Sequence, residues 1–377
     1  MKRNLLLWGL LILPLSHLTA QNNEPKLAEG LTEIHDLFNT SMNPGVSCFR
    51  IPSLVTATNG DLVVAIDERV PSCNDLRGSD DINIVIRRSQ DHGKSWSEIE
   101  KIVDFPVGRS ASDPSMIVDQ VTGEIFLFYN FMDLKNESDI YYLHVIRSSD
   151  HGKSWSEPED ITSQIAKGKW HKDFKFITSG RGIQTRRGKL LHCMVNLDHG
   201  LHLFGSDDHG KSWHLIDTAL KPGNESKVVE LDDGSWMVNC RPDRKGKRFV
   251  HTSSDQGKSW DSRPEPKLID PGCNGSIIRY TSIEDGYECS RLLFCNAKHK
   301  KGRENLTVRI SYDEGLSWSE GKCIYPGFAA YSTLAVLENG NIGLLFEKDY
   351  YTENMFVSFS LEWLTDGEDS YEKPLAK

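Results

Sequence analysis

A chain of 377 residues, of which 38% are hydrophobic and 26% charged, is long and apolar enough to bury a sizeable globular core. Its formal net charge of −10 makes it a poor candidate for binding nucleic acid or an anionic membrane surface. No segment beyond residue 20 approaches the roughly 18 consecutive apolar residues of a membrane-spanning helix, so the sequence predicts no membrane span.

The start of the chain has the pattern of an export signal. Two basic residues precede an apolar run from Leu5 to Leu13, and small residues end the stretch at Ala20. This order predicts a signal peptide over residues 1–20, cut near Ala20, and therefore a secreted or periplasmic protein. Residues 21–44 are then expected to form an N-terminal lead-in. Residues 45–377 are expected to form a single domain, because no linker or shift in composition divides them.

An eight-residue pattern, S-x-D-x-G-x-x-W, recurs five times at intervals of 47 to 59 residues. Each copy follows a short apolar or alternating run that predicts a strand. The aspartate can accept hydrogen bonds from turn amides and the glycine tolerates a positive φ, so each copy predicts a structural turn outside any reacting site. The five copies begin at Ser89, Ser148, Ser206, Ser253 and Ser311.

Repeats of this period are typical of radially arranged supersecondary units. A step of about 58 residues divides residues 45–377 into about six units, although the last, from about residue 319, has no copy of the pattern. Helical periodicity is nearly absent, apart from a short helix expected within residues 156–170. The sequence therefore predicts an all-β fold, a six-bladed β-propeller, with a strand from residues 30–47 closing the ring.

Eight cysteines are present, and an exported protein could pair them in disulfides. The sequence leaves their pairing open, because most of them lie in strand-like runs where a thiol also serves as a small buried apolar group. The chain contains no CxxC, no zinc-type spacing and no HExxH motif. It therefore predicts no metal site and no cofactor.

The segment Cys48-Phe-Arg-Ile-Pro52 precedes the first complete strand of the predicted fold. Alone, an arginine before Ile-Pro carries little information, but together with five copies of the repeated pattern it is specific. The chain resembles the sialidase (neuraminidase) family, whose members combine an F/Y-R-I-P motif with Asp-box (BNR) repeats. The resemblance runs from about Val46 to Glu362. It implies a propeller that acts on sialylated glycans, glycoproteins or glycolipids.

The substrate of that family explains a set of arginines. Sialic acid carries a carboxylate on its anomeric carbon, and guanidinium groups bind a carboxylate bidentately while staying charged. By similarity to the family, three arginines hold this carboxylate: Arg50 in FRIP, Arg241 in VNCRP and Arg303 in GRENL. Arg309 lies close enough in sequence to compete with Arg303 for the third position.

The nucleophile faces a related electrostatic problem. A carboxylate nucleophile would be repelled by the carboxylate of the substrate, whereas a neutral phenol avoids this repulsion, and sialidases use a tyrosine. The resemblance places this role on Tyr331 in the segment GFAAYS. A phenol has a pKa near 10 and needs a base, and Glu225 in GNES matches the glutamate that the family pairs with it.

The resemblance implies four further pocket residues. Arg69 matches an arginine near a sugar hydroxyl, and Asp113 matches an aspartate beside the N-acetyl group. Glu347 matches the carboxylate that orients the first arginine of the triad. Gln184 is expected to line the floor of the pocket.

The leaving oxygen needs a proton from an acid on the side opposite the nucleophile. The family places an aspartate on the loop that here spans residues 71–81, which offers Asp75, Asp80 and Asp81. The string Asn74-Asp-Leu76 resembles the family motif best, so Asp75 is the predicted acid and base. Asp81 is expected to anchor the loop at the start of the next strand, and sequence position alone does not decide among the three.

Together these residues predict an exported exo-α-sialidase that releases terminal sialic acid with retention through a tyrosyl-enzyme intermediate. One alternative is a trans-sialidase, which differs in how well it excludes water and binds an acceptor sugar. Another alternative is a sialic-acid-binding lectin on a sialidase scaffold. A lectin needs the arginines but has no use for Tyr331 and Glu225, so the sequence favours an enzyme.

Overall fold

The computed structural model of the protein describes residues 25–241 and 246–374. The predicted signal peptide, including its cut near Ala20, lies outside these residues. The described residues form 25 β-strands and only short helical segments, which confirms the predicted all-β propeller arrangement. Among them there is no helix with the length and apolar character needed to cross a membrane.

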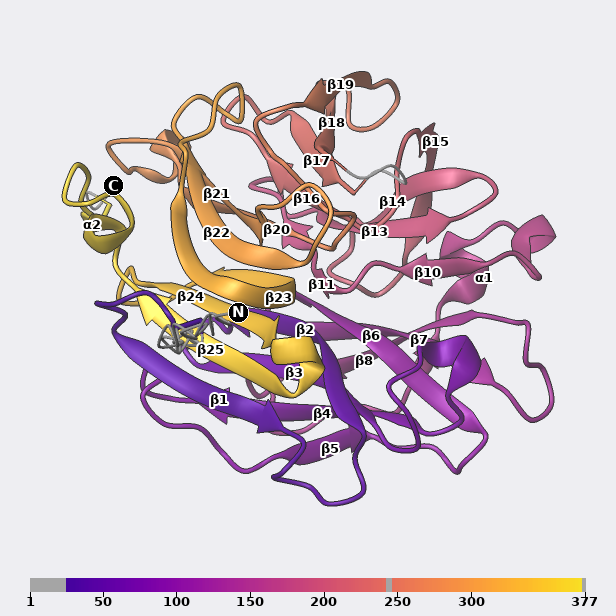
Figure 1. Ribbon diagram of the computed structural model, residues 1–377. Helices are drawn as coiled ribbons and strands as arrows, with labels where there is room; N and C mark the ends of the chain where they lie inside the picture. The colour runs from indigo at the N-terminus through magenta and orange to yellow at the C-terminus, as the bar shows by residue number, and fades with distance from the viewer. Residues whose placement is uncertain (1–24, 242–245, 375–377) are drawn as a thin grey trace, which may run out of the picture.

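The strands form five hydrogen-bonded sheets arranged around a central axis (Figure 1). The first sheet contains β2 (Cys48–Thr56), β3 (Leu62–Arg69), β4 (Ile82–Ser89) and β5 (Glu100–Val103). The second contains β6 (Arg109–Val118), β7 (Ile125–Asp133), β8 (Tyr142–Ser148), β9 (Glu159–Asp160) and the parallel strand β11 (Gly180–Arg181). The third contains β10 (Lys175–Ile177), β12 (Ile183–Gln184), β13 (Leu190–Asn196), β14 (Gly200–Ser206) and β15 (His214–Leu220).

The remaining two sheets complete the ring. The fourth contains β16 (Ser226–Glu230), β17 (Trp236–Cys240), β18 (Arg248–Ser253) and β19 (Asp261–Glu265). The fifth has seven strands, namely β20 (Ser276–Thr281), β21 (Arg291–Ala297), β22 (Glu304–Ser311), β23 (Lys322–Val336), β24 (Ile342–Lys348), β25 (Glu353–Phe359) and β1 (Glu33–Asn39). The innermost strands in Figure 1 are β2, β6, β11, β16, β20 and β23. The strands at the outside of the ring include β1, β5, β15 and β19.

The seven-stranded sheet differs from the six separate blades that the sequence predicts. Strand β23 is 15 residues long, and its first half pairs with β22 while its second half pairs with β24. Because one continuous strand belongs to both ladders, two groups of strands merge into one sheet. The predicted closing strand is β1, which lies antiparallel to β25 and so joins the two ends of the chain.

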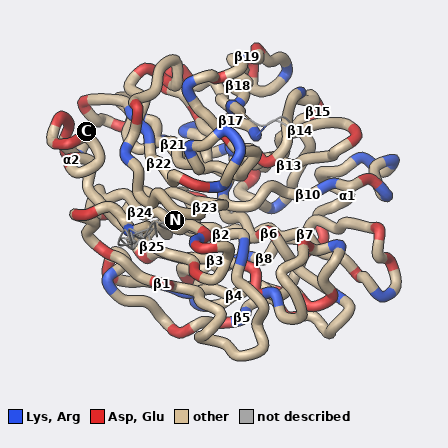
Figure 2. Tube along the Cα trace, viewed as in Figure 1, with Lys and Arg blue, Asp and Glu red and all other residues tan. Residues whose placement is uncertain are grey.

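Helices occupy little of the chain. The short helix expected within residues 156–170 is α1 (Thr162–Ile165), followed by the 3₁₀ turn η2 (Gly168–Trp170). The other short segments are η1 (Leu76–Gly78), η3 (Ile283–Asp285), η4 (Asp349–Tyr351) and α2 (Leu361–Leu364). Basic and acidic positions are interspersed along the trace in the view of Figure 2.

The repeated eight-residue pattern forms the same hydrogen-bonded turn after β4, β8, β14, β18 and β22. In the second copy, the backbone N–H of Gly152 donates to Oγ of Ser148 (2.8 Å), which itself donates to Oδ1 of Asp150 (2.8 Å). Asp150 also accepts from the backbone N–H (2.9 Å) and the hydroxyl (2.6 Å) of Ser154. The bonds from Ser154 contribute most to lowering the pKa of Asp150 to about 2. His151 and Gly152 both have positive φ, at 62° and 82°.

The tryptophans of this pattern pack under the turns to different depths. Trp213 is 4% exposed and meets Phe126 and Phe128 edge to face, with ring centroids 5.5 and 5.0 Å apart. Trp155 is only partly buried, against a neighbouring cluster of apolar side chains. The turns therefore tie the outer strands of each sheet to the apolar layer between sheets.

We expect Trp213→Ala to lower the free energy of unfolding by about 3–5 kcal/mol, the usual cost of removing a buried large aromatic side chain. Trp155→Ala should cost less, because part of that indole already faces water. Urea unfolding of the two variants measures both values. A cost for Trp155→Ala that equals or exceeds the cost for Trp213→Ala would contradict this ranking of the two packing sites.

Candidate active site

The candidate site forms where the inner strands begin. Arg50 is the third residue of β2, and the antiparallel register places it opposite Asp67 near the end of β3. Asp113 lies in the first half of β6, Glu225 immediately precedes β16, and Tyr331 lies where β23 starts to pair with β24. Residues that are far apart in sequence therefore meet at one end of the central axis.

Glu347 holds the first arginine in place. Its side chain is fully buried, and its Oε1 accepts from Nε of Arg50 (3.2 Å) and from the backbone N–H of Ile51 (2.9 Å). Its Oε2 accepts from the backbone N–H of Tyr331 (3.0 Å). One carboxylate thus fixes both the guanidinium of Arg50 and the strand that carries Tyr331.

The phenol of Tyr331 is surrounded by cationic groups. Its Oη accepts from Nη1 of Arg241 (3.4 Å), and the same Nη1 donates to Oε2 of Glu225. The Cζ atoms of Arg50 and Arg303 each lie 5.5 Å from the centroid of its ring. The structure therefore brings the three sequence-predicted arginines together around one tyrosine.

Burial and the nearby carboxylate of Glu225 raise the pKa of Tyr331 well above its usual value, although Arg241 and Arg50 oppose this change. Tyr331 as a whole residue is 9% exposed. Tyr331 is consequently a neutral phenol at physiological pH, and it needs a base if its oxygen is to form a bond.

Arg303 and Arg309 differ in where they point. Arg303 donates from Nη1 to Oη of Tyr351 (2.9 Å), beside the ring of Tyr331. Arg309 is buried between strands, where it donates from Nη1 to Oδ1 of Asn296 (3.0 Å), and burial lowers its pKa to about 10. The structure thus places Arg303, and not Arg309, among the residues around Tyr331.

Asp75 lies over the arginines on the loop between β3 and β4. Its Oδ1 accepts from Nη1 of Arg69 (2.8 Å) and from Nη1 of Arg50 (3.4 Å), while 81% of its side chain is exposed. A disulfide between Cys48 and Cys73 ties this loop to the start of β2. Burial opposes ionisation of Asp75, but attraction to Arg69, Arg50 and then Arg303 outweighs it, so the pKa of Asp75 lies below its usual value.

The other two aspartates of this loop lie elsewhere. Asp81 accepts from Nδ2 of Asn83 (3.1 Å), and its backbone carbonyl accepts from the N–H of Val70, as expected of an anchor at the start of β4. Asp80 is exposed and its backbone carbonyl accepts from the N–H of Gly108. Of the three candidates, the structure brings Asp75 to Arg50 and Arg69.

Asp113 faces a second buried carboxylate. Its backbone N–H donates to Oδ1 of Asp67 (2.9 Å), and its Oδ2 accepts from Nδ2 of Asn130 (3.0 Å). Burial and the charge of Asp67 raise the pKa of Asp113, so this group holds a proton more tightly than an ordinary carboxyl. Its φ of 64° is unusual for a residue other than glycine and turns the chain within β6.

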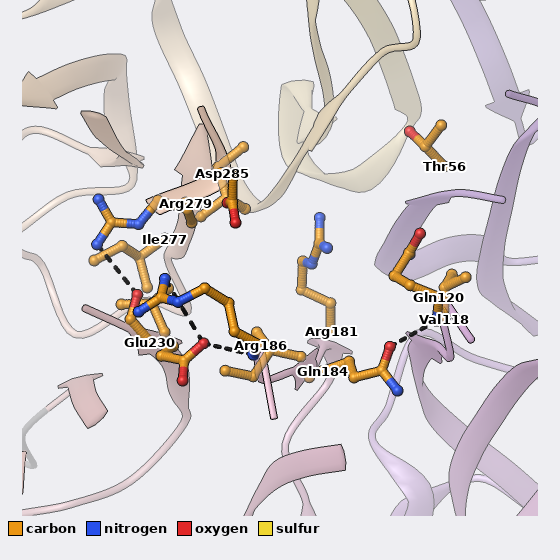
Figure 3. Close-up of a pocket in the computed structure, with 14 residues that line it drawn as sticks. Thr56, Val118, Gln120, Arg181, Gln184, Arg186, Glu230, Ile277, Arg279 and Asp285 are labelled. Atoms are coloured by element: carbon orange, nitrogen blue, oxygen red, sulfur yellow. Dashed lines mark hydrogen bonds and ion pairs between the residues drawn. The ribbon is translucent and has the colours of Figure 1, made fainter. Parts of the chain in front are cut away.

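Gln184 is not brought to this cluster. Its Oε1 accepts from the backbone N–H of Gln120 (2.7 Å), and its Nε2 donates to Oδ1 of Asp119 (2.8 Å). Both partners follow the C-terminal end of β6, whereas Asp113 lies in the first half of that strand. Gln184 therefore lines a separate pocket at the opposite end of the inner strands (Figure 3).

The structure adds several groups around the site to those predicted from the sequence. Asp67 forms an ion pair with Arg69 (2.9 Å). This pair could have been predicted from the sequence, because residues two apart in a strand share one face. The ring centroid of Tyr351 lies 4.1 Å from Cζ of Arg50. No motif in the sequence marks this tyrosine. Lys227 is buried on β16 beside Glu225, and burial lowers its pKa to about 8. Its position inside the ring follows from the fold alone.

Comparison with known proteins finds matches over most of the chain. A family model described as a BNR repeat-like domain matches residues 75–344. The curated sialidase of Micromonospora viridifaciens is 33% identical over 347 residues, which cover 85% of this chain and 52% of that protein. The curated sialidase of Bacteroides fragilis is 29% identical over 333 residues, which cover 80% and 60%. A solved Hadza microbial sialidase matches at 27% identity with a TM-score of 0.79, over 88% of this chain and 69% of that one.

The fold and the site together define a propeller in which three arginines surround a buried tyrosine. The chain belongs to the sialidase family with BNR repeats, since the family model covers more than half of it. The chain spans 52% and 60% of the length of the two curated relatives above.

Proposed function

We propose that the protein is a retaining exo-α-sialidase that removes terminal sialic acid from glycans, glycoproteins or glycolipids. The single observation that carries the proposal is the convergence of Arg50, Arg241 and Arg303 on the phenol of Tyr331. Three guanidinium groups suit a carboxylate on the anomeric carbon. A neutral phenol beneath them suits a nucleophile that must approach this anion.

The proposed reaction has two displacement steps. In the first, Oη of Tyr331 bonds to the anomeric carbon and passes its proton to Glu225, while Asp75 protonates the departing glycosidic oxygen. In the second, water attacks the anomeric carbon and gives a proton to Asp75, and the phenol leaves and regains its proton from Glu225. Two inversions yield net retention. Arg241, which donates to both Glu225 and Tyr331, holds the base near the nucleophile.

We also propose that the protein is exported and that its ring has six blades. The N-terminal pattern over residues 1–20 supports export. The blade count rests on dividing the seven-stranded sheet along β23, because residues 322–328 pair with β22 and residues 329–336 pair with β24. This division gives two four-stranded groups, β20 to β23 and β23 to β1, beside the other four sheets.

Release of a fluorescent phenol from an aryl α-sialoside tests the activity. We expect release without any acceptor sugar, with the α-anomer of free sialic acid as the first product seen by NMR. A lectin would bind the sialoside without releasing the phenol. A trans-sialidase would release it mainly when lactose is added and would form sialyllactose. Either of these two results would overturn the proposed hydrolysis.

Arg303 and Arg309 provide a matched pair of variants. Arg303→Ala should lower kcat/KM by about 10²-fold or more, because a desolvated carboxylate loses one charged partner. Arg309→Ala should leave KM near the wild-type value at a temperature where it remains folded, because Arg309 contacts Asn296 inside the sheet. Steady-state kinetics on the aryl sialoside compares the two. An essential Arg309 with a dispensable Arg303 would show that the third arginine is wrongly assigned.

A further inference from the structure

A cavity lies on the central axis, at the end of the inner strands opposite Arg50. It has a volume of about 190 Å³ and is lined by the last residues of β2, β6 and β16, namely Thr56, Val118 and Glu230. Arg181 projects into it from β11, and Figure 3 shows its side chain in the space between Arg279 on one side and Gln120 on the other. The proposed catalytic residues do not line this cavity.

Arg181 has no acidic partner among the described residues. Its Nη1 donates to the backbone carbonyl of Leu334 (3.1 Å), whereas its Nε is buried without any hydrogen-bond partner. Burial, with no opposing charge, lowers its pKa to about 10, so the group remains a cation at neutral pH. Arg181 is partly buried, and a partly desolvated cation without an anion is costly, so natural proteins usually pair such groups.

The other two arginines of the cavity already have acidic partners. Arg279 forms an ion pair with Glu314 (2.7 Å). Arg186 donates from its backbone N–H to Oε2 of Glu230 (2.8 Å), and their side chains lie 3.8 Å apart. Asp285 lines the cavity but is an exposed residue. Of the three arginines that line the cavity, Arg181 alone has no acidic partner among the described residues.

We propose that this cavity is an anion-binding site, in which Arg181 binds a small oxyanion such as inorganic phosphate. The guanidinium of Arg181 extends into the cavity and supplies N–H donors there, and pairing with an anion offsets the cost of desolvating the cation. The side chain of Gln120 at the wall of the cavity offers a further amide donor. The site is distinct from the arginine triad, so its occupancy should change the stability of the ring and not the chemistry at Tyr331.

Thermal unfolding with increasing phosphate tests this site, with sodium chloride at equal ionic strength as the reference. We expect phosphate to raise the Tm of the wild-type protein by about 2–4 °C relative to chloride. Arg181→Met should abolish this rise. Arg186→Met, which removes a lining arginine that is paired with Glu230, should keep it. Without phosphate, the Tm of Arg181→Met should not fall below that of the wild type, because the variant removes an unpaired cation.

The arginine triad could also bind phosphate, so Arg50→Ala is the second control. The rise in Tm should persist in Arg50→Ala, and Arg181→Met should hydrolyse an aryl sialoside with an unchanged KM. The proposal is overturned if the rise persists in Arg181→Met, if it disappears in Arg50→Ala, or if chloride has the same effect as phosphate. If Arg181→Met does not fold, Arg181→Lys replaces it in the experiment. An undiminished affinity of Arg181→Lys for phosphate would exclude a site that depends on the guanidinium group.

Discussion

Replacement of Tyr331 by phenylalanine should lower kcat by at least about 10³-fold, because the variant lacks the oxygen that forms the proposed covalent bond. The fold should survive, since the ring still fills its buried position and Glu347 contacts only the backbone N–H of Tyr331. Tyr351→Phe is the matched control. It removes a hydroxyl that accepts from Arg303 but leaves the nucleophile intact, so its loss of kcat should be far smaller.

Covalent labelling provides a second test of Tyr331 as the nucleophile. A fluorinated sialic acid that slows breakdown of the intermediate should add its mass to the wild-type protein. Peptide mapping should place the added mass on Tyr331, and Tyr331→Phe should remain unlabelled. A label on Glu225 or on any other carboxylate, or a first product with inverted anomeric configuration, would exclude the tyrosyl-enzyme mechanism.

The second large effect concerns Asp75 and depends on the leaving group. Asp75→Ala should be severely impaired on sialyllactose, whose departing oxygen needs a proton. It should retain far more activity on an aryl sialoside with an acidic phenol, because that leaving group departs without protonation. The ratio of kcat/KM for the two substrates, compared with the ratio for the wild type, measures the effect.

The pH profile gives an independent test of the same residue. Arg69, Arg50 and Arg303 hold the pKa of Asp75 below its usual value, so the free enzyme carries Asp75 as an anion at neutral pH. A bound substrate carboxylate offsets these cations and should raise this pKa. We therefore expect kcat on sialyllactose to fall as pH rises through the pKa of Asp75 in the complex. Asp75→Ala should lose this dependence.

Asp80→Ala and Asp81→Ala serve as controls in both experiments. Asp80 is exposed, and Asp81 contacts Asn83 at the start of β4. Neither variant should change the preference between the two substrates. If one of them shows the leaving-group dependence while Asp75→Ala is equally impaired on both substrates, the acid is not Asp75.

The local pattern of the sequence predicted the scaffold well, because its signals act over a few residues. Each copy of the S-x-D-x-G-x-x-W pattern contains its own donors, acceptors and glycine, so the turn around Asp150 closes without help from distant segments. The number of separate sheets was not predictable in this way. Whether β23 breaks or continues between its two partners depends on how β22 and β24 are placed in the ring.

The sequence by itself determined the class of the protein, since FRIP and five spaced repeats are readable without coordinates. It also named the arginines and Tyr331, because short motifs surround them. Only the tertiary structure decided which of two nearby groups lies beside Tyr331 or Arg50, as for Arg303 against Arg309 and for Asp75 against Asp81. The structure also shows that Gln184 lies at the opposite end of the axis from the predicted site. The physical reason is that the direction of a side chain depends on strand register and loop path, which contacts between distant segments establish.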